Sequence, residues 1–223
     1  MPSQTKAVIW DMDGVIADTG PYHFKSWHYV FQKRGVDFTE EDFKRIFGQR
    51  NDTIIRGTLG KDVSQIDIDV IAAEKENYFR EAVRQNIKPF PGAIELIKDL
   101  YEHDFSIALA SSAPMENIQL ISEKLGVKDF FHAIVYGREV TEGKPSPQGF
   151  LLAARKLGVE AKNCIVVEDA VAGVTAAKRA GMLGVAVTNT HPANRLAEAD
   201  LIVSSLEQVN TSYLEKLLSQ RKL

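Results

Sequence analysis

Short apolar runs alternate along most of the chain with longer segments of helical periodicity. The runs are too short for helices and suit strands that are buried on both faces of a sheet. They lie at Ala7–Trp10, Ser106–Ala110, Ala133–Tyr136, Cys164–Val167, Gly184–Val187 and Leu201–Val203. Strands that alternate with helices predict an α/β fold with a doubly wound parallel sheet.

One long segment interrupts this alternation directly behind the first strand. From Gly20 to Lys88 the apolar residues follow helical spacing, and Thr39 with Asp42 predicts the start of one of its helices. A longer helix is expected over residues 69–85. The pattern therefore predicts an α-helical domain, residues 20–88, inserted into an α/β domain formed by residues 1–19 and 89–223.

Composition narrows the possible partners of the protein. The chain has 223 residues, 44% of them hydrophobic, which suffices for one large core and a small second module. A net charge of −3 gives no basic surface, so we expect no nucleic-acid partner. No apolar run is long enough to span a membrane, and the first residues lack an apolar signal core. We therefore expect a cytoplasmic protein that does not bind membranes.

Cys164, in an apolar run, is expected to pack in the core.

Two acids directly follow the first strand. Asp11 and Asp13 lie two residues apart, so on an extended backbone their side chains project to the same side. Two like charges at this distance repel each other unless a cation or a shared proton relieves them, and Mg²⁺ with oxygen ligands is a natural solution. Gly14 allows a tight turn behind the acids. In open α/β sheets ligands bind at this edge.

Other polar residues follow the later strands at the same edge of the predicted sheet. Each has an ordinary structural interpretation when taken alone: a helix N-cap for the serine, a surface lysine, and a turn for the last acid pair. Together they offer acids for a metal, a hydroxyl and an ammonium for an anion, and a carboxylate that can attack, which fits phosphoryl transfer. The set is Asp11, Asp13, Ser111, Lys144, Glu168 and Asp169.

These motifs resemble those of the haloacid dehalogenase superfamily, in its β-phosphoglucomutase-like branch with a helical cap after the first strand. Four motifs occur in the family's order and span almost the whole chain. They are Asp11-Met12-Asp13-Gly14-Val15, then Ser111 after the second strand, then Lys144-Pro145-Ser146-Pro147, and Glu168-Asp169 leading into Ala172-Gly173.

The resemblance implies a role for each motif residue. Asp11 would be the nucleophile that forms an aspartyl-phosphate, and Asp13 would protonate the leaving oxygen and then activate water. Ser111 and Lys144 would hold the phosphoryl oxygens. The resemblance also implies a Mg²⁺ cofactor, bound by Asp11, by the backbone carbonyl of Asp13 and by Asp169, with Glu168 beside them.

The inserted helical segment adds three candidate substrate-binding residues. The stretch from Asp18 to Trp27 and the loop at Gly48-Gln49-Arg50-Asn51 are similar to the β-phosphoglucomutases, and this implies substrate contacts by Thr19, His23 and Arg50. Structural alternatives are a hinge histidine and a solvated loop arginine.

Two departures distinguish the chain from those mutases. It lacks their lysine after Ser111, where it has Ser112-Ala113-Pro114, and their cap lysine aligns only loosely with Lys75. We therefore predict a monomeric phosphatase that hydrolyses a small phosphorylated metabolite, such as a sugar phosphate. The alternative is a β-phosphoglucomutase. A catalytically retired metabolite-binding protein is a third hypothesis, although no motif residue is missing.

Overall fold

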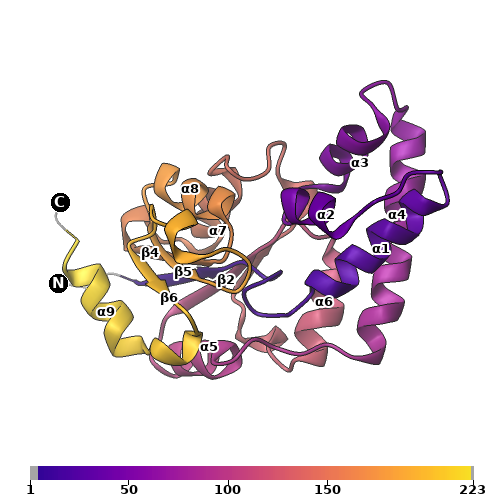
Figure 1. Cartoon of the computed structure of the whole chain (residues 1–223). Helices are drawn as coiled ribbons and strands as arrows, with labels where there is room; N and C mark the ends of the chain where they lie inside the picture. The colour runs from indigo at the N-terminus through magenta and orange to yellow at the C-terminus, as the bar shows by residue number, and fades with distance from the viewer. Residues whose placement is uncertain (1–4, 222–223) are drawn as a thin grey trace. The chain divides into compact units, whose positions relative to one another are not determined.

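The computed structural model describes residues 5–221, and the chain divides into two compact units. The first unit comprises the chain up to Asp18 and from Lys88 onward, and the second is Thr19–Ile87. The first unit contains the sheet with its flanking helices, and the second consists of helices (Figure 1).

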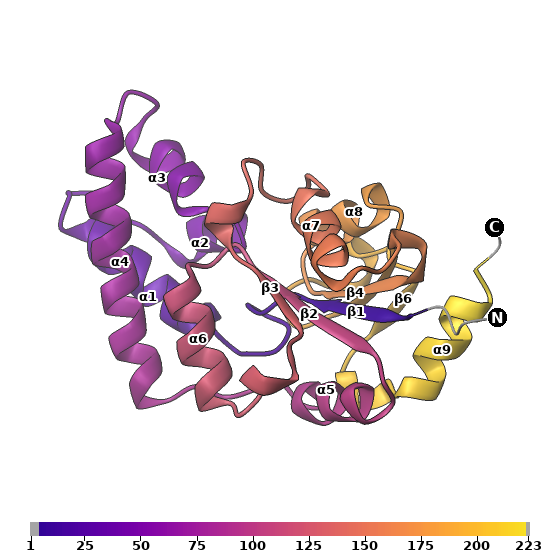
Figure 2. The same cartoon turned by 180° about the vertical axis from the view of Figure 1, so that it is seen from behind.

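The sheet of the first unit has six parallel strands in the order β3-β2-β1-β4-β5-β6. β1 lies inside the sheet, with Ala7 paired with Ser106 on one side and Cys164 on the other. Figure 2 shows β3, β2, β1 and β4 side by side. The strands are β1 Ala7–Trp10, β2 Ser106–Ala110, β3 Ala133–Val135, β4 Cys164–Glu168, β5 Leu183–Val187 and β6 Leu201–Val203.

Helices cover both faces of this sheet, with α7 and α8 on one face and α5 on the other (Figure 1). The helices of the unit are α5 Ala93–Glu102, α6 Met115–Lys124, α7 Gln148–Leu157, α8 Val171–Arg179 and α9 Thr211–Ser219. Short 3₁₀ turns are η1 Lys128–Phe130, η2 Gly137–Glu139, η3 Ala161–Asn163, η4 Ala193–Arg195 and η5 Leu206–Gln208. The prediction of a doubly wound parallel sheet is confirmed.

Burial on both faces explains why the strands are continuous apolar runs. Ala7 and Ile9 point into a cluster with Phe150 of α7 and with Ala176 and Ala177 of α8. The intervening residues of β1 are just as inaccessible to solvent. Because neither face of β1, β4 or β5 meets water, no polar alternation is needed in these central strands.

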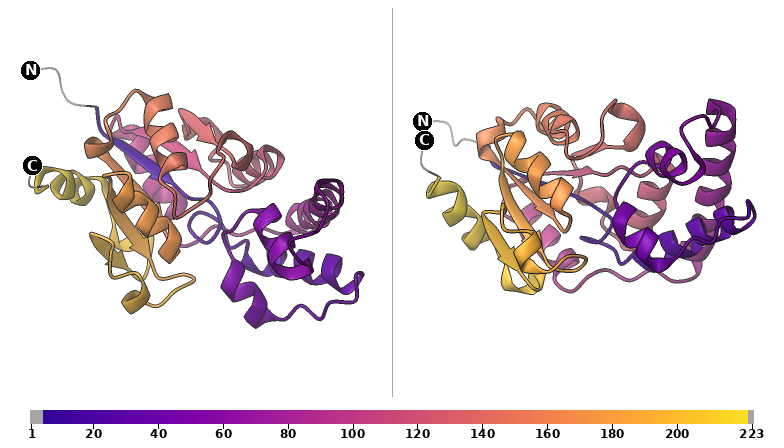
Figure 3. Two further views of the ribbon diagram at one scale, coloured as in Figure 1. Left: turned by 90° about the horizontal axis from the view of Figure 1, so that it is seen from above. Right: turned by 45° about the horizontal axis from the view of Figure 1, so that its top comes forward.

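The second unit packs four helices around its own apolar core (Figure 3). The helices are α1 Gly20–Gln32, α2 Glu40–Ile46, α3 Asn51–Leu59 and α4 Gln65–Gln85. Trp27 and Phe31 of α1 stack at 5.2 Å between ring centroids and belong to this core with Ile55. The expected helix start at Thr39 is confirmed, because Thr39 and Asp42 form a capping box.

The structure corrects several predicted helix and strand ends. α4 begins at Gln65, four residues earlier than expected, because the Ser64 side chain accepts a hydrogen bond from the Asp67 amide. β4 includes Glu168, which was expected just beyond the strand. α9 was not predicted at all. Among residues 5–221, none of the helices combines the length and apolar character needed to cross a membrane.

Candidate active site

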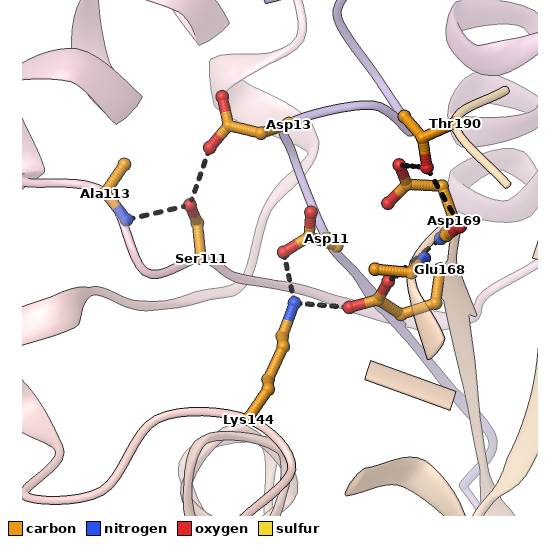
Figure 4. A network of polar contacts seen from close by, with 9 residues as sticks. Asp11, Asp13, Ser111, Ala113, Lys144, Glu168, Asp169 and Thr190 are labelled. Atoms are coloured by element: carbon orange, nitrogen blue, oxygen red, sulfur yellow. Dashed lines mark hydrogen bonds and ion pairs between the residues drawn. The ribbon is translucent and has the colours of Figure 1, made fainter. Parts of the chain in front are cut away.

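The six predicted motif residues of the first unit come together at the carboxyl edge of the sheet. Parallel strands present all their carboxyl ends at one edge, so residues far apart in sequence meet there. Figure 4 shows how they converge. Asp11 and Asp13 follow β1, Ser111 follows β2, Lys144 lies in the loop before α7, Glu168 ends β4, and Asp169 follows it.

Lys144 connects two of the acids. Its Nζ lies 2.5 Å from Oδ1 of Asp11 and also forms an ion pair with Oε1 of Glu168. Burial by itself would lower the pKa of Lys144, but the two carboxylates more than offset this effect and raise it. Lys144 is therefore a permanently charged ammonium at the centre of the site.

Three carboxylates form a group that could hold a metal ion. Asp11, Glu168 and Asp169 are each at most 6% exposed, and one oxygen of each lies within 4.8 Å of the others. Burial is the main reason why the pKa of Asp11 is raised to about 7 and that of Asp169 well above its ordinary value, and the neighbouring acids add to both shifts. Carboxylate oxygens are the donors that Mg²⁺ prefers, and a cation would relieve this repulsion. The residues present therefore fit Mg²⁺.

Backbone amides and a close-packed glycine fix the Glu168 side chain. Its Oε2 accepts hydrogen bonds from the amides of Asp169 and Ala170, both at 2.9 Å. A Cβ added at Gly173 would lie 1.9 Å from Oε1 of Glu168, so only glycine allows α8 to approach this carboxylate. The position of the Glu168 carboxylate is therefore fixed by the backbone at the start of α8 and by Lys144.

Asp13 has a different environment from Asp11. Ser111 Oγ donates a hydrogen bond to Oδ2 of Asp13 at 3.4 Å and accepts one from the Ala113 amide at 3.1 Å. The Asp13 side chain does not belong to the three-carboxylate group. The two aspartates that the sequence places two residues apart thus have separate partners, which suits separate chemical roles.

The three remaining candidates lie in the helical unit. Thr19 precedes α1, and His23 in the first turn of α1 stacks on Phe79 at 4.1 Å between ring centroids. His23 Nδ1 also contacts Nζ of Lys75 at 2.9 Å. Arg50 precedes α3 and forms an ion pair with Asp52 at 3.2 Å.

Lys75 is held by its neighbours in the helical unit. Its Nζ donates to Oε1 of Glu76 at 2.8 Å and lies over the rings of Trp27 and Phe79. Glu76 also accepts a hydrogen bond from Asn51 Nδ2 at 2.8 Å. These contacts cannot be predicted from the sequence, because the neighbours of Lys75 include His23 and Trp27 of α1, and Asn51, which contacts Glu76, belongs to α3.

Two further residues contact the first-unit site and were not singled out from the sequence. Thr190 Oγ1 lies 2.5 Å from Oδ2 of Asp169, and Asn189 Nδ2 donates to the Gly14 carbonyl at 2.8 Å. Both follow β5, whose neighbour β4 carries Glu168 and leads into Asp169. The rule that polar residues after parallel strands meet at one edge could have found them.

Comparisons with known proteins agree with this geometry. A family model described as haloacid dehalogenase-like hydrolase matches residues 5–181. β-Phosphoglucomutase from Bacillus subtilis is 32% identical over 98% of this chain and 97% of its own length. A phosphorylated carbohydrates phosphatase from Thermotoga maritima is 33% identical over 79% of this chain and 82% of its own. The crystal structure of β-phosphoglucomutase from Clostridium difficile superposes with a TM-score of 0.88 at 30% identity, covering 97% of this chain and 98% of that one.

Proposed function

The chain belongs to the haloacid dehalogenase-like hydrolases, and we propose that it is a Mg²⁺-dependent phosphatase of small sugar phosphates. The observation that carries the proposal is the cluster at the carboxyl edge of the sheet. It brings together the carboxylate of Asp11, the ammonium of Lys144, the hydroxyl of Ser111 and further buried acids. These residues match the four motifs that the sequence shares with the family.

Asp11 is the proposed nucleophile. Its carboxylate must be ionised to attack phosphorus, and burial opposes ionisation, whereas the contact with Lys144 favours it. Attack by Asp11 forms a bond from a carboxylate oxygen to phosphorus while the ester oxygen leaves. The product is an aspartyl-phosphate on Asp11, which water then hydrolyses to release inorganic phosphate.

Asp13 is the proposed general acid and base. An alcohol leaving group needs a proton, which Asp13 donates in the first step and recovers from the attacking water in the second. The hydrogen bond from Ser111 orients the Asp13 side chain separately from Asp11. In this proposal Ser111 and Lys144 also hold the phosphoryl oxygens, with a hydroxyl and a positive charge.

Charge neutralisation is the remaining requirement. A carboxylate and a phosphate ester are both anions, so their approach is unfavourable without added positive charge. Asp11, the Asp13 carbonyl and Asp169 would hold Mg²⁺, with Glu168 beside them, and the ion would supply that charge when bound. Lys144 supplies a second positive charge from the protein itself.

The choice of phosphatase over mutase rests on the helical unit. A mutase must hold a bisphosphate at both ends, which needs cationic side chains in the helical unit. Lys75 is already bound by Glu76 and packed against two aromatic rings. The lysine that follows the serine motif in the mutases is absent, because this chain has Ser112-Ala113-Pro114 there. Two β-phosphoglucomutases among the similar proteins keep the mutase as the second candidate.

A single assay separates the two candidates. The enzyme is incubated with β-glucose 1-phosphate, Mg²⁺ and a trace of glucose 1,6-bisphosphate, and both inorganic phosphate and glucose 6-phosphate are measured. We expect phosphate release, which also proceeds from a panel of sugar monophosphates without any bisphosphate. Fast formation of glucose 6-phosphate with negligible phosphate release would make the protein a mutase.

Arg50 is proposed to bind a part of the substrate that does not react, together with Thr19 and His23. Such a contact contributes equally to ground state and transition state, so its loss raises KM and leaves kcat nearly unchanged. We expect Arg50→Ala to raise KM for small sugar phosphates by about tenfold, as one charged hydrogen bond is worth about 1.5 kcal/mol. Arg45→Ala is the control, since Arg45 is an exposed arginine paired with Asp42 in α2 of the same unit. A fall in kcat alone would contradict this role.

A further inference from the structure

The loop after β5 makes contact with two parts of the proposed metal site at once. Asn189 Nδ2 donates to the Gly14 carbonyl at 2.8 Å, and Gly14 directly follows Asp13. Thr190 Oγ1 lies 2.5 Å from Oδ2 of Asp169 and 3.0 Å from the Asp169 carbonyl (Figure 4). The loop therefore joins the turn behind the first two acids to the last acid.

The Thr190 hydroxyl donates a hydrogen bond to one carboxylate oxygen of Asp169. A hydroxyl has one hydrogen to donate, and the shorter contact is the one to the charged oxygen Oδ2. Gly14 packs against the same atom: a Cβ at Gly14 would lie 2.1 Å from Oδ2 of Asp169. Gly14 has a φ of 85°, so both its conformation and this approach require glycine. Oδ2 is therefore enclosed between Thr190 and Gly14.

This enclosure leaves one Asp169 oxygen for a cation. The second oxygen lies on the side of Asp11 (Figure 4), and Asp169 belongs to the three-carboxylate group. Mg²⁺ demands near-octahedral coordination and takes single oxygens of carboxylates, whereas Ca²⁺ accepts six to eight ligands and often both oxygens of one carboxylate. A carboxylate restricted to one oxygen suits the smaller ion.

We propose that Thr190 restricts Asp169 to a one-oxygen ligand and thereby makes the site select Mg²⁺ over Ca²⁺. The proposal rests on the metal site of the proposed function. Thr190 is a positioning residue in this scheme, since it acts through Asp169 and not on the substrate. Asn189 supports the same arrangement, because it anchors the loop to the Gly14 turn.

Direct cation binding tests the proposal without reference to catalysis. Metal-free protein is titrated calorimetrically with Mg²⁺ and, separately, with Ca²⁺, in the absence of substrate. The variants are Thr190→Val, which keeps the shape but removes the hydroxyl, and Thr190→Ser, which keeps the hydroxyl. Thr188→Val is the control on the same loop; the Thr188 amide donates to the Val203 carbonyl, and no hydrogen bond joins its side chain to Asp169.

We expect Thr190→Val to raise the Kd for Mg²⁺ by about tenfold, the lower range for loss of a group that orients a metal ligand. The Kd for Ca²⁺ should stay the same or fall, because the Asp169 carboxylate, no longer held by the hydroxyl, can turn Oδ2 towards the ion. Thr190→Ser and Thr188→Val should keep the wild-type ratio of the two constants. If Thr190→Val does not fold, as judged by thermal unfolding, Thr190→Ala carries the same comparison.

Two results would overturn the inference. An unchanged ratio of Kd values in Thr190→Val, including equal weakening of binding for both ions, would exclude a role in selection. Wild-type protein that binds neither ion would remove the metal site as well. Phosphate release by the wild type is measured in parallel: a phosphatase whose Thr190→Val variant keeps the wild-type ratio refutes this inference alone. A protein without phosphatase activity whose ratio shifts as expected refutes the proposed function alone.

Discussion

Both units of the molecule bury charged side chains, but they balance the charges differently. In the helical unit Glu76 is paired with Lys75 and receives a hydrogen bond from Asn51. Burial alone would raise the pKa of Glu76, but Lys75, His23 and Asn51 together more than offset this effect, and the pKa is lowered. In the first unit burial is not offset, and the pKa of Asp11 rises to about 7.

The two units differ in how many positive charges are available to their buried carboxylates. The first-unit site brings together four carboxylates, of Asp11, Asp13, Glu168 and Asp169, and the lysine that contacts two of them is Lys144. A buried charge without a partner is costly, so a fold keeps such a surplus only where something else supplies the missing charge. Balanced buried charges therefore indicate structure, and unbalanced ones indicate a ligand site.

The largest expected effect comes from removing the acid that reacts. Asp11→Asn keeps the shape of the side chain, but an amide is a poor nucleophile, so turnover should fall by about 10⁴-fold or more while the fold is retained. Steady-state phosphate release measures the effect, and circular dichroism checks the fold. Asp129→Asn, in η1, is the control substitution. Turnover within about tenfold of the wild type would rule out a covalent intermediate on Asp11.

Removing the proposed metal ion tests whether the excess of buried carboxylates in the first unit needs a cation. Chelation should lower phosphate release by about 10³-fold, equivalent to about 4 kcal/mol of charge stabilisation, and added Mg²⁺ should restore it. Ca²⁺ should inhibit, because its loose coordination admits a second oxygen of Asp11 and disturbs the attack. Full activity in excess chelator would show that the acids need no metal.

Lys75 and Glu76, the paired charges of the helical unit, should affect the stability of the fold, whereas the first-unit acids affect turnover. Lys75→Met leaves Glu76 buried without its cation and should cost about 3–5 kcal/mol of unfolding free energy. The double variant Lys75→Met/Glu76→Gln removes both charges and should recover most of that loss. Urea unfolding of the full chain, followed by circular dichroism, measures both. A double variant as unstable as the single one would show that the pair is more than a neutralised contact.

The sequence predicts the first-unit site better than the contacts of the helical unit, for a physical reason. Strands buried on both faces leave an unmistakable run such as Cys164-Ile165-Val166-Val167, and parallel strands put their ends at one edge. Asp11 and Lys144 could therefore be expected near each other although 133 residues separate them. Their chemical roles rest on the family resemblance and stay predictions.

Helix–helix contacts follow no such rule. The neighbours of Lys75 include His23 of α1, 52 residues away, and no periodicity in the sequence states which helix faces meet. The pattern does not predict the start of α4, although Ser64 and Asp67 carry a capping pattern, because the first apolar residues of that helix, from Ile66 to Val70, alternate as in a strand. The edge rule places Thr190 near the site, but it does not say which acid the hydroxyl contacts; the bond to Asp169 comes from the structure.

Asp99 provides a third environment and the smallest expected effect. This partly exposed carboxylate accepts hydrogen bonds from the Oγ1 and the amide of Thr211, at 2.6 and 2.9 Å, and so connects α5 to the start of α9. Both donors lower the pKa of Asp99 below its ordinary value of 3.8, and the Thr211 hydroxyl has the larger effect. His103 Nδ1 also lies 3.2 Å from Oδ1 of Asp99 and adds a smaller lowering of the pKa, so this charge is held mainly by neutral donors, between the extremes of Glu76 and Asp11.

A lowered pKa fixes the sign of the pH dependence. Above the unfolded-state pKa of 3.8 the ionised Asp99 contributes its full stabilisation, and this is lost as the pH falls through the lower folded-state pKa. Asp99→Asn keeps an acceptor but no charge, so from about pH 5, where His103 is already protonated, the difference in stability between wild type and variant should shrink as the pH falls towards 3. Because the group is partly exposed, the difference at pH 7 should be below about 1 kcal/mol. Urea midpoints of both proteins across this range measure it. A difference that grows as the pH falls in this range would contradict the lowered pKa of Asp99 and show that the hydrogen bonds from Thr211 do not hold this charge.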